Sequence, residues 1–376
     1  MHIRGRVLPV ASALVFALFM CALSVSAQDK KGAQKIDKAQ QAEIASAVKI
    51  MDGVMAGQPA PADIKFTWLH HSMKSLDGKA YVPFLLLFDK DQKLPSAMTY
   101  YIRVVDKATV GEHEKALAAY KASLDKAEAA ARLDPENVDL AEAAEKLRGQ
   151  APKRNFAFED LRTFSFSGPP ARLPGAFSVP GGDYDVYVLL KEPTASVKDK
   201  KAQPRAGLLK TELTVPNYWT DQLATSSIIV SSQTEQLKAP PTQDDVNKNP
   251  YIFGMTRVSV PVEAKFAKKD ELTIIFYIYN TGLDKTTGKP DLSVDYNFYR
   301  KADGVEKFFN RTNPQLLNAT TLSPQFDAKA GHQLLGGLGI PLASFPEGDY
   351  RLEIKITDKV TGQTKVQSSL FTVTAG

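Results

Sequence analysis

One motif occurs twice in this chain, and it constrains the fold more than any other feature of the sequence. Residues 180–190 read PGGDYDVYVLL and residues 346–356 read PEGDYRLEIKI, so that Tyr184 and Tyr350 lie 166 residues apart. In both copies a Gly-Asp turn leads into a run with alternating apolar residues, which is typical of a β-strand. Similar residues precede the two copies, LPGAFSVP and IPLASFP. We therefore expect two related β domains.

The repeated motif resembles the tyrosine corner of immunoglobulin-like β-sandwiches, in which the tyrosine hydroxyl hydrogen-bonds back to the turn. The C-terminal region reads LASFPEGDYRLEIKITD over 342–358 and FTV over 371–373. It resembles the closing strands of immunoglobulin-like domains in exported bacterial proteins. This resemblance implies a β-sandwich for the C-terminal region and transfers no catalytic residue. We therefore expect Tyr184 and Tyr350 to be structural corner residues.

Changes in composition divide the chain into segments. Residues 28–60 are polar and then helical, 61–232 and 250–376 are rich in strand-like runs, and 233–249 are polar with two prolines. We expect a mainly β fold of two tandem immunoglobulin-like β-sandwich domains, joined by a linker over 233–249. A strand over 226–232 is expected to close the first domain.

The first domain contains an expected helical insertion over 109–150. Apolar residues between Val110 and Ala131 recur at spacings of three, four and seven, which indicates an amphipathic helix. Asp134 can cap a second helix with Pro135 at its first position. The words LDPEN resemble one tetratricopeptide unit, but such arrays need about three repeats. We expect a helical hairpin that packs on the adjoining sheet.

The first 27 residues have the pattern of a signal peptide. Arg4 and Arg6 precede the apolar run Val7–Leu23, and small residues end at Ala27, where we expect cleavage. The alternatives are a membrane anchor and a lipoprotein that is acylated on Cys21. We expect an exported protein, periplasmic or secreted, with no transmembrane span after cleavage, and a bacterial host.

Charge and cysteine content exclude several classes of protein. Loss of the leader removes two arginines and the only cysteine, which leaves 45 basic against 42 acidic residues. Nucleic-acid binding requires clustered cations on one face, and no such cluster stands out. Without disulfides, the mature chain depends on burial of its cores. We expect no nucleic-acid partner.

Catalytic and metal-binding motifs are incomplete. The stretch 282–289 has five residues between its glycines instead of the four of a phosphate-binding loop, and Pro290 follows it. The SxxK at 123–126 has no partner motif. On one strand His70 and His71 would point to opposite faces, so that they could not bind the same metal ion. We expect no cofactor, no metal and no enzymatic activity.

Aromatic residues are dense in the second domain: Phe276, Tyr277, Tyr279, Tyr296, Phe298, Tyr299, Phe308 and Phe309. By strand alternation Tyr277 and Tyr279 share one face. With Tyr299 they are candidates for a surface that binds a ligand or partner, although the first domain can also cover this face.

The function we expect is that of a non-enzymatic extracytoplasmic binding or scaffold protein. Its partner would be a protein or a cell-envelope polysaccharide. The alternatives are a carbohydrate-binding protein that uses the aromatic face, or a hydrolase with an unrecognised site. Because fold alone does not define function, the motifs leave these alternatives open.

Overall fold

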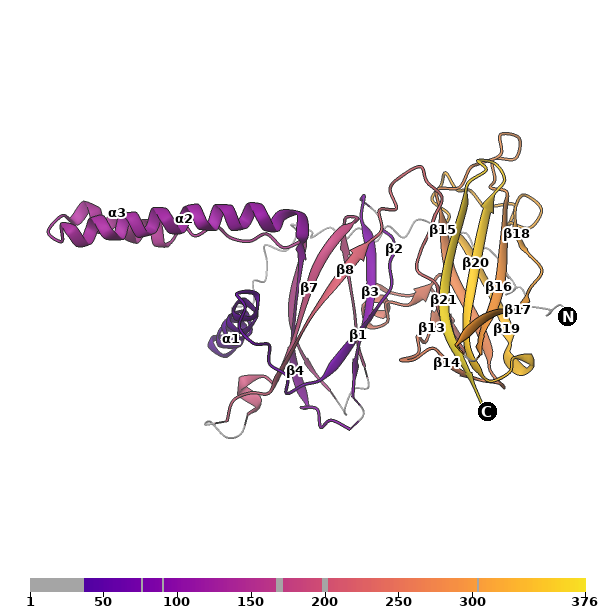
Figure 1. Cartoon of the computed structure of the whole chain (residues 1–376), viewed down its shortest axis with the longest axis horizontal. Coiled ribbons are helices and arrows are strands. Elements are labelled where there is room, and N and C mark those ends of the chain that lie inside the picture. Colours follow the sequence, from indigo (N-terminus) through magenta and orange to yellow (C-terminus); the bar gives the residue numbers. More distant parts are fainter. Residues whose placement is uncertain (1–36, 76, 90, 167–171, 198–201, 303) are drawn as a thin grey trace.

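The protein is mainly β, as the strand-like runs predicted (Figure 1). The computed structural model describes residues 37–75, 77–89, 91–166, 172–197, 202–302 and 304–376. The expected signal peptide, 1–27, and the polar residues 28–36 lie outside the described residues. Within the described part, no helix has the length and apolar character that would let it cross a membrane.

Two β-sheets enclose the first hydrophobic core, and we call this unit the first sandwich. One sheet has the order β1-β3-β6, with β2 also paired to β3, and the other has the order β5-β4-β7-β8. The strands are β1 (Phe66–His70), β2 (Met73–Lys74), β3 (Ala80–Phe88), β4 (Ala97–Asp106), β5 (Phe158–Ser165), β6 (Arg172–Val179), β7 (Gly182–Lys191) and β8 (Ala206–Val215). A short 3-10 helix, η1 (Thr194–Ser196), follows β7.

A second pair of sheets encloses a separate core, and we call it the second sandwich. One sheet has the order β10-β15-β19, with β9 also on β15, and the other has the order β14-β21-β20-β16-β17, with β18 on β16. The elements are β9 (Ala224–Thr225), β10 (Ile229–Ser231), β14 (Lys265–Ala267), β15 (Glu271–Tyr279), β16 (Leu292–Ala302), β17 (Val305–Arg311), β18 (Gln315–Leu317), β19 (Leu334–Pro341), η2 (Leu342–Ser344), β20 (Gly348–Asp358) and β21 (Thr364–Thr374).

The two sandwiches share one strand order. Strands β1-β3-β6 correspond to β10-β15-β19, and β5-β4-β7-β8 correspond to β17-β16-β20-β21. A glycine faces a phenylalanine ring across the first sheet of each: Gly175 faces Phe84, and Gly336 faces Phe276. A Cβ on Gly175 would lie 2.3 Å from the ring of Phe84, and one on Gly336 would lie 2.5 Å from that of Phe276. The two units are therefore alike down to single contacts.

The repeated tyrosines also make the same contact in the two sandwiches. The Tyr184 hydroxyl donates to the carbonyl of Pro180 at 2.8 Å, and the Tyr350 hydroxyl donates to that of Pro346 at 2.6 Å. Both side chains are fully buried, and each belongs to the core of its own sandwich. Each tyrosine thus ties the start of its strand to the turn before it.

Helix α1 (Lys38–Met55) covers the outer face of the sheet that contains β4 and β7. Its N-cap is Asp37, whose side chain accepts from the backbone of Gln40 while the Gln40 side chain accepts from the backbone of Asp37. Ala47 and Met51 lie on one side of the helix and are completely buried against this sheet. The N-terminal helical segment is therefore part of the first sandwich.

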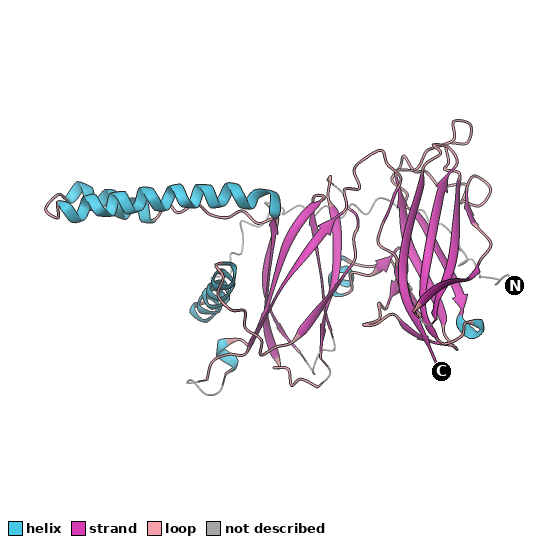
Figure 2. Ribbon diagram, in the orientation of Figure 1, coloured by secondary structure: helices cyan, strands magenta, loops and turns pink. Residues whose placement is uncertain are grey.

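Beyond its first turn, where Val110 contacts the cluster under α1, the helical insertion does not pack on the adjoining sheet, which corrects our expectation. Helices α2 (Lys107–Leu133) and α3 (Val138–Arg148) form a hairpin that projects away from the first sandwich (Figures 1 and 2). No residue of α2 is buried. The physical reason is that α1 already occupies the outer face of that sheet. The cap of α3 is Asn137 rather than Asp134.

The segment expected to be a linker contains regular structure. Strand β11 (Thr234–Gln236) joins β13 (Thr256–Val258) and β12 (Ile252–Phe253) in a small sheet, and α4 (Gln243–Lys248) lies between β11 and β12 in the sequence. The strand expected to close the first domain also lies elsewhere, because β10 pairs with β15 of the second sandwich. The chain thus passes to the second sandwich before Ala224.

Candidate functional site

The two sandwiches meet through a continuous apolar contact. Leu85 and Leu87 on the outer face of β3, Ile275 on β15, and Tyr251 and Phe253 around the small sheet belong to one buried cluster. Polar contacts reinforce it, since the guanidinium group of Arg172 donates to the carbonyl of Val260 at 2.8 Å. This contact, which we call the junction, fixes the surfaces that border it.

The three tyrosines expected on one face do not share a surface. Tyr277 and Tyr279 lie at the junction, and the Tyr279 hydroxyl accepts from the backbone N–H of Lys74 at 3.1 Å. Burial raises the pKa of Tyr279 well above its ordinary value. Tyr299 lies on β16 in the other sheet, where the guanidinium carbon of Arg351 is 4.2 Å from the centroid of its ring. The first sandwich therefore covers Tyr277 and Tyr279 but not Tyr299.

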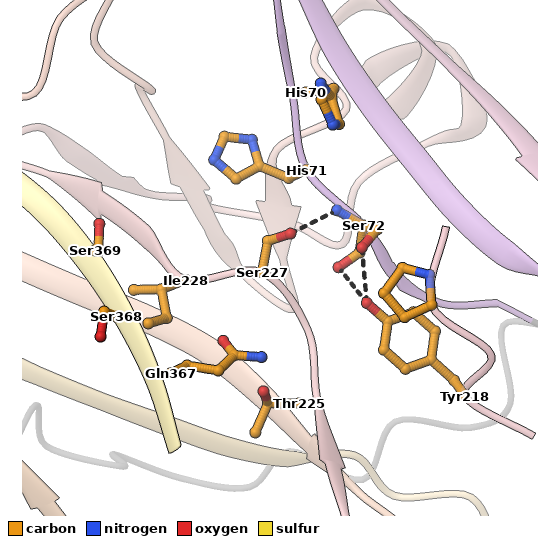
Figure 3. Close-up of a pocket in the computed structure, with 11 residues that line it drawn as sticks. His70, His71, Ser72, Tyr218, Thr225, Ser227, Ile228, Gln367, Ser368 and Ser369 are labelled. Carbon is orange, nitrogen blue, oxygen red and sulfur yellow. Dashed lines mark hydrogen bonds between the residues drawn. The ribbon is translucent and has the colours of Figure 1, made fainter. Parts of the chain in front are cut away.

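A cleft of about 310 Å³ opens beside the junction (Figure 3). One wall consists of residues 70–72 and Tyr218 from the first sandwich and the segment that follows it. The opposite wall consists of Thr225, Ser227 and Ile228, together with residues 367–369 of β21. Its volume is at the lower end of the range of small-molecule pockets. The lining is mostly polar.

Backbone and side-chain hydrogen bonds hold the two walls in place. The N–H of Ser72 donates to the Ser227 hydroxyl at 2.9 Å, and the N–H of Ser227 donates to the carbonyl of Ser72 at 2.9 Å. The Tyr218 hydroxyl lies 2.7 Å from the Ser72 hydroxyl (Figure 3). Since these bonds join the two sandwiches directly, the cleft is formed before any ligand arrives.

The hydroxyl of Thr225 is the unusual group in this cleft. Thr225 is only 4% exposed, and its Oγ1 has no hydrogen-bond partner among the described residues. A buried hydroxyl without a partner carries a desolvation cost of about 1–3 kcal/mol. A ligand with a polar group at this position would remove that cost. Because the Oγ1 atom is itself covered, the Thr225 side chain has to rotate toward the cleft before a ligand can bond with it.

The two adjacent histidines both line the cleft, although strand alternation predicted opposite faces. Strand β1 ends at His70, so the alternation does not continue to His71. Nδ1 of His71 lies 3.0 Å from the hydroxyl of Tyr251. Over the described part of the chain, no three or more His, Cys, Asp or Glu residues come together as metal ligands would. The sequence offered no signal for this site, because its walls come from distant segments.

We expect acid to weaken the folded state through His71. Burial, together with the positive charge of His70, lowers the pKa of His71 from 6.5 to about 4. Between these values the unfolded chain binds a proton and the folded chain does not. The free energy of unfolding should therefore fall by up to about 3 kcal/mol as the pH drops from about 6.5 to about 4. Denaturant titrations of the wild type and His71→Asn at several pH values measure this contribution, which the variant should lack.

The matched control is His332→Asn, in a loop of the second sandwich. This variant should keep the acid-dependent loss that His71→Asn removes. If both variants lose stability in acid as much as the wild type does, His71 is not the responsible group.

No protein-family model matches the chain, and no curated protein matches it. Solved structures give matches of low score. A family 123 glycoside hydrolase from Clostridium perfringens is 8% identical over 40% of this chain and 28% of that chain, with a TM-score of 0.19. The structure pT26-6p is 10% identical over 90% and 70%, with a TM-score of 0.18. A mutant of Salmonella alpha-2-macroglobulin is 9% identical over 84% and 17%, with a TM-score of 0.20. This chain spans less than a third of the hydrolase and of the macroglobulin. Matches with TM-scores this low assign neither a fold family nor a function.

Proposed function

We propose that this is a non-enzymatic extracytoplasmic binding or scaffold protein built from two tandem immunoglobulin-like domains, and that it binds its ligand in the cleft beside the junction. The shared strand order and the two tyrosine corners support the immunoglobulin-like assignment. The unpartnered hydroxyl of Thr225 is the observation that carries the cleft as the binding site. The N-terminal pattern supports export.

The carbohydrate-binding alternative has less support. Aromatic platforms for sugars need exposed rings, and Tyr277 and Tyr279 are covered at the junction. Tyr299 remains, beside Phe308, which is 57% exposed. One aromatic pair on the outer face of β16 and β17 is a smaller surface than the one that the sequence suggested.

The hydrolase alternative would require a nucleophile with a base beside it. Ser72 follows His71 directly in the sequence, and Ser227 bonds with Ser72 in the cleft (Figure 3). The Ser72 hydroxyl contacts Tyr218, and the Ser227 hydroxyl accepts from the backbone of Ser72. Neither contact activates a serine, so the geometry supports binding more strongly than catalysis.

A variant with a filled cleft tests the proposal. Ser369→Trp places an indole in the cleft, whereas Ser293→Trp places one on the outer face of β16 in the same sandwich. Each mature protein is immobilised and exposed to a cell-envelope extract, and the retained peptides and glycans are identified by mass spectrometry. The wild type and Ser293→Trp should retain the same molecules, and Ser369→Trp should lose them. Equal retention by both variants, with unchanged thermal melts, would reject the cleft as the binding site.

A further inference from the structure

One edge of strand β21 is unpaired over most of its length. Its last three residues bond in parallel with β14, and its whole length bonds with β20. From Thr364 to Leu370, no described strand pairs with the other edge. Residues 367–369 of this stretch line the cleft. The free edge therefore opens into the candidate binding site.

The register identifies which backbone groups are free. The N–H of Asp358 donates to the carbonyl of Gln363 at 2.9 Å, so Gln363 and every second residue after it bond with β20. The residues between them direct their N–H and C=O groups to the other edge, as Thr372 does when its N–H donates to the carbonyl of Ala264 at 2.8 Å. Val366, Ser368 and Leu370 therefore present donors and acceptors beside the cleft that no described strand pairs with.

The first sandwich shows how this chain covers the equivalent edge. Strand β8 corresponds to β21, and the extended segment 61–64 lies against its start. The N–H of Asp63 donates to the carbonyl of Ala206 at 2.8 Å, and the N–H of Leu208 donates to that of Pro61 at 2.9 Å. In the first sandwich an extended segment thus occupies the edge that is open on β21.

The side chains on the two edges also differ, since those on β8 are charged and two of those on β21 are apolar. The uncovered part of β8 presents Lys210 and Glu212, and charged residues of this kind protect an edge from pairing with another strand. By register, the equivalent residues of β21 are Ser368 and Leu370. Leu370 is 70% exposed and Val366 is 50% exposed. The edge of β21 therefore lacks the protection that β8 has and carries apolar side chains instead.

We propose that an extended peptide segment of another protein adds to the free edge of β21 as a further strand. Its backbone would bond with Val366, Ser368 and Leu370, and every second side chain would lie beside Val366 and Leu370 on the outer face. The side chains between them would point into the cleft, where a polar residue can bond with the hydroxyl of Thr225 once that side chain rotates toward it. This proposal rests on the cleft being the binding site, and it names the ligand class.

The shape of the site favours a single strand over a second copy of this chain. The edge opens into a cleft of about 310 Å³ that residues 70–72, Thr225 and residues 227–228 border on the opposite side. One extended peptide can enter such a cleft. The edge strand of a second folded sandwich brings the rest of its sheets with it. Strand addition of this kind takes its affinity from backbone bonds and its specificity from alternate side chains.

The test selects ligands with the full mature chain, residues 28–376, from a library of random linear heptapeptides. Selected peptides should have apolar residues at alternate positions. In a scan that methylates one backbone nitrogen at a time, every second position should weaken binding about tenfold. In hydrogen exchange of the wild-type chain, the peptide should slow the amides of Val366, Ser368 and Leu370 while their neighbours, already bonded to β20, change little.

Two variants separate the backbone from the side chain at one position. Ser368→Pro removes the free N–H on the edge and leaves the bonds to β20, whereas Ser368→Thr keeps that N–H. We expect about tenfold weaker binding for Ser368→Pro and unchanged binding for Ser368→Thr. Equal affinity for both variants, tolerance of methylation at every position, or unprotected edge amides would overturn the proposal. Because the hydrogen-exchange measurement uses the wild-type chain, it tests the proposal even if Ser368→Pro does not fold.

Two further results would also reject strand addition by a peptide. The first is a dimer in sedimentation that Ser368→Pro dissociates, since a second copy would then occupy the edge. The second is a ligand that Ser369→Trp loses and Ser368→Pro keeps, in which case the cleft binds something other than a strand and the proposed function stands. If Ser369→Trp loses nothing, the proposed function itself fails.

Discussion

Replacing Glu43 by alanine should lower the free energy of unfolding by about 3–5 kcal/mol. Glu43 lies on α1, and its carboxylate accepts from the ammonium group of Lys191 at 2.7 and 2.8 Å and from both the N–H and the hydroxyl of Thr194 at 2.9 Å. The side chain of Lys191 is only 1% exposed. Without Glu43 a buried cation would lose its counter-ion. Urea denaturation of wild type and Glu43→Ala measures the difference.

Two controls show whether the buried charge is the cause. The double variant Glu43→Leu/Lys191→Met removes both charges and should recover most of the loss, because apolar residues replace a buried ion pair at little cost. Asp244→Ala breaks an exposed pair with Lys248 on α4 and should change stability by less than about 1 kcal/mol. A double variant as unstable as Glu43→Ala would contradict this explanation.

The same pair makes stability depend on pH. Burial raises the pKa of Glu43, but hydrogen bonds from Lys191, Thr194 and Thr99 outweigh it and hold the pKa below its ordinary value of 4.5. A carboxyl group with a lowered folded pKa stabilises the protein above its unfolded pKa. That contribution disappears as the pH falls through the lowered value. Glu43→Ala and the wild type should therefore converge in stability at strongly acidic pH.

Replacing Tyr350 by alanine should cost about 3–5 kcal/mol of unfolding free energy. Its ring is stacked on Phe371 at a centroid distance of 5.2 Å and meets Phe345 at 5.3 Å and Phe309 at 5.5 Å. Alanine leaves a cavity among these rings. Phenylalanine keeps the ring and removes only the hydrogen bond to the carbonyl of Pro346. Because Pro346 is exposed, its carbonyl can bond to water instead, and the expected loss of unfolding free energy is about 1 kcal/mol. Denaturant melts at neutral pH measure both variants.

The same order, alanine worse than phenylalanine, should hold at Tyr184. Tyr299→Ala is the control, because that tyrosine lies on an outer face beneath Arg351 and leaves no core cavity. It should cost less than about 2 kcal/mol. Four corner variants with the midpoint of the wild type would reject the corner role of both tyrosines.

The local sequence pattern predicted which segments form strands and helices better than it predicted where those elements pack in the fold. The alternation after Tyr184 and Tyr350 indicated strands, and the spacing between Val110 and Ala131 indicated a helix; β7, β20 and α2 lie there. Both signals depend on neighbours in the sequence, which a pattern records directly. The mainly β character followed from many such short runs.

The positions of these elements depend on contacts that a local pattern does not record. Nothing in the hairpin sequence shows that α1 already covers the sheet beside it, and nothing in 226–232 shows that this segment pairs with β15. The cleft is the extreme case, since Ser72, Thr225 and Ser369 come from three distant segments. Its key signal, an unpartnered buried hydroxyl, exists only once the chain is folded.

Helix α2 follows strand β4 without a loop, so the helical hairpin extends straight out from the first sandwich. Strand β4 ends at Asp106, and α2 begins at the next residue and continues for 27 residues. At 1.5 Å per residue, its far end stands about 40 Å from the sheet. Leu133, which is 87% exposed, lies at that end. Because the junction packs the two sandwiches against each other, the hairpin separates its tip from the edge of β21 as a spacer arm would.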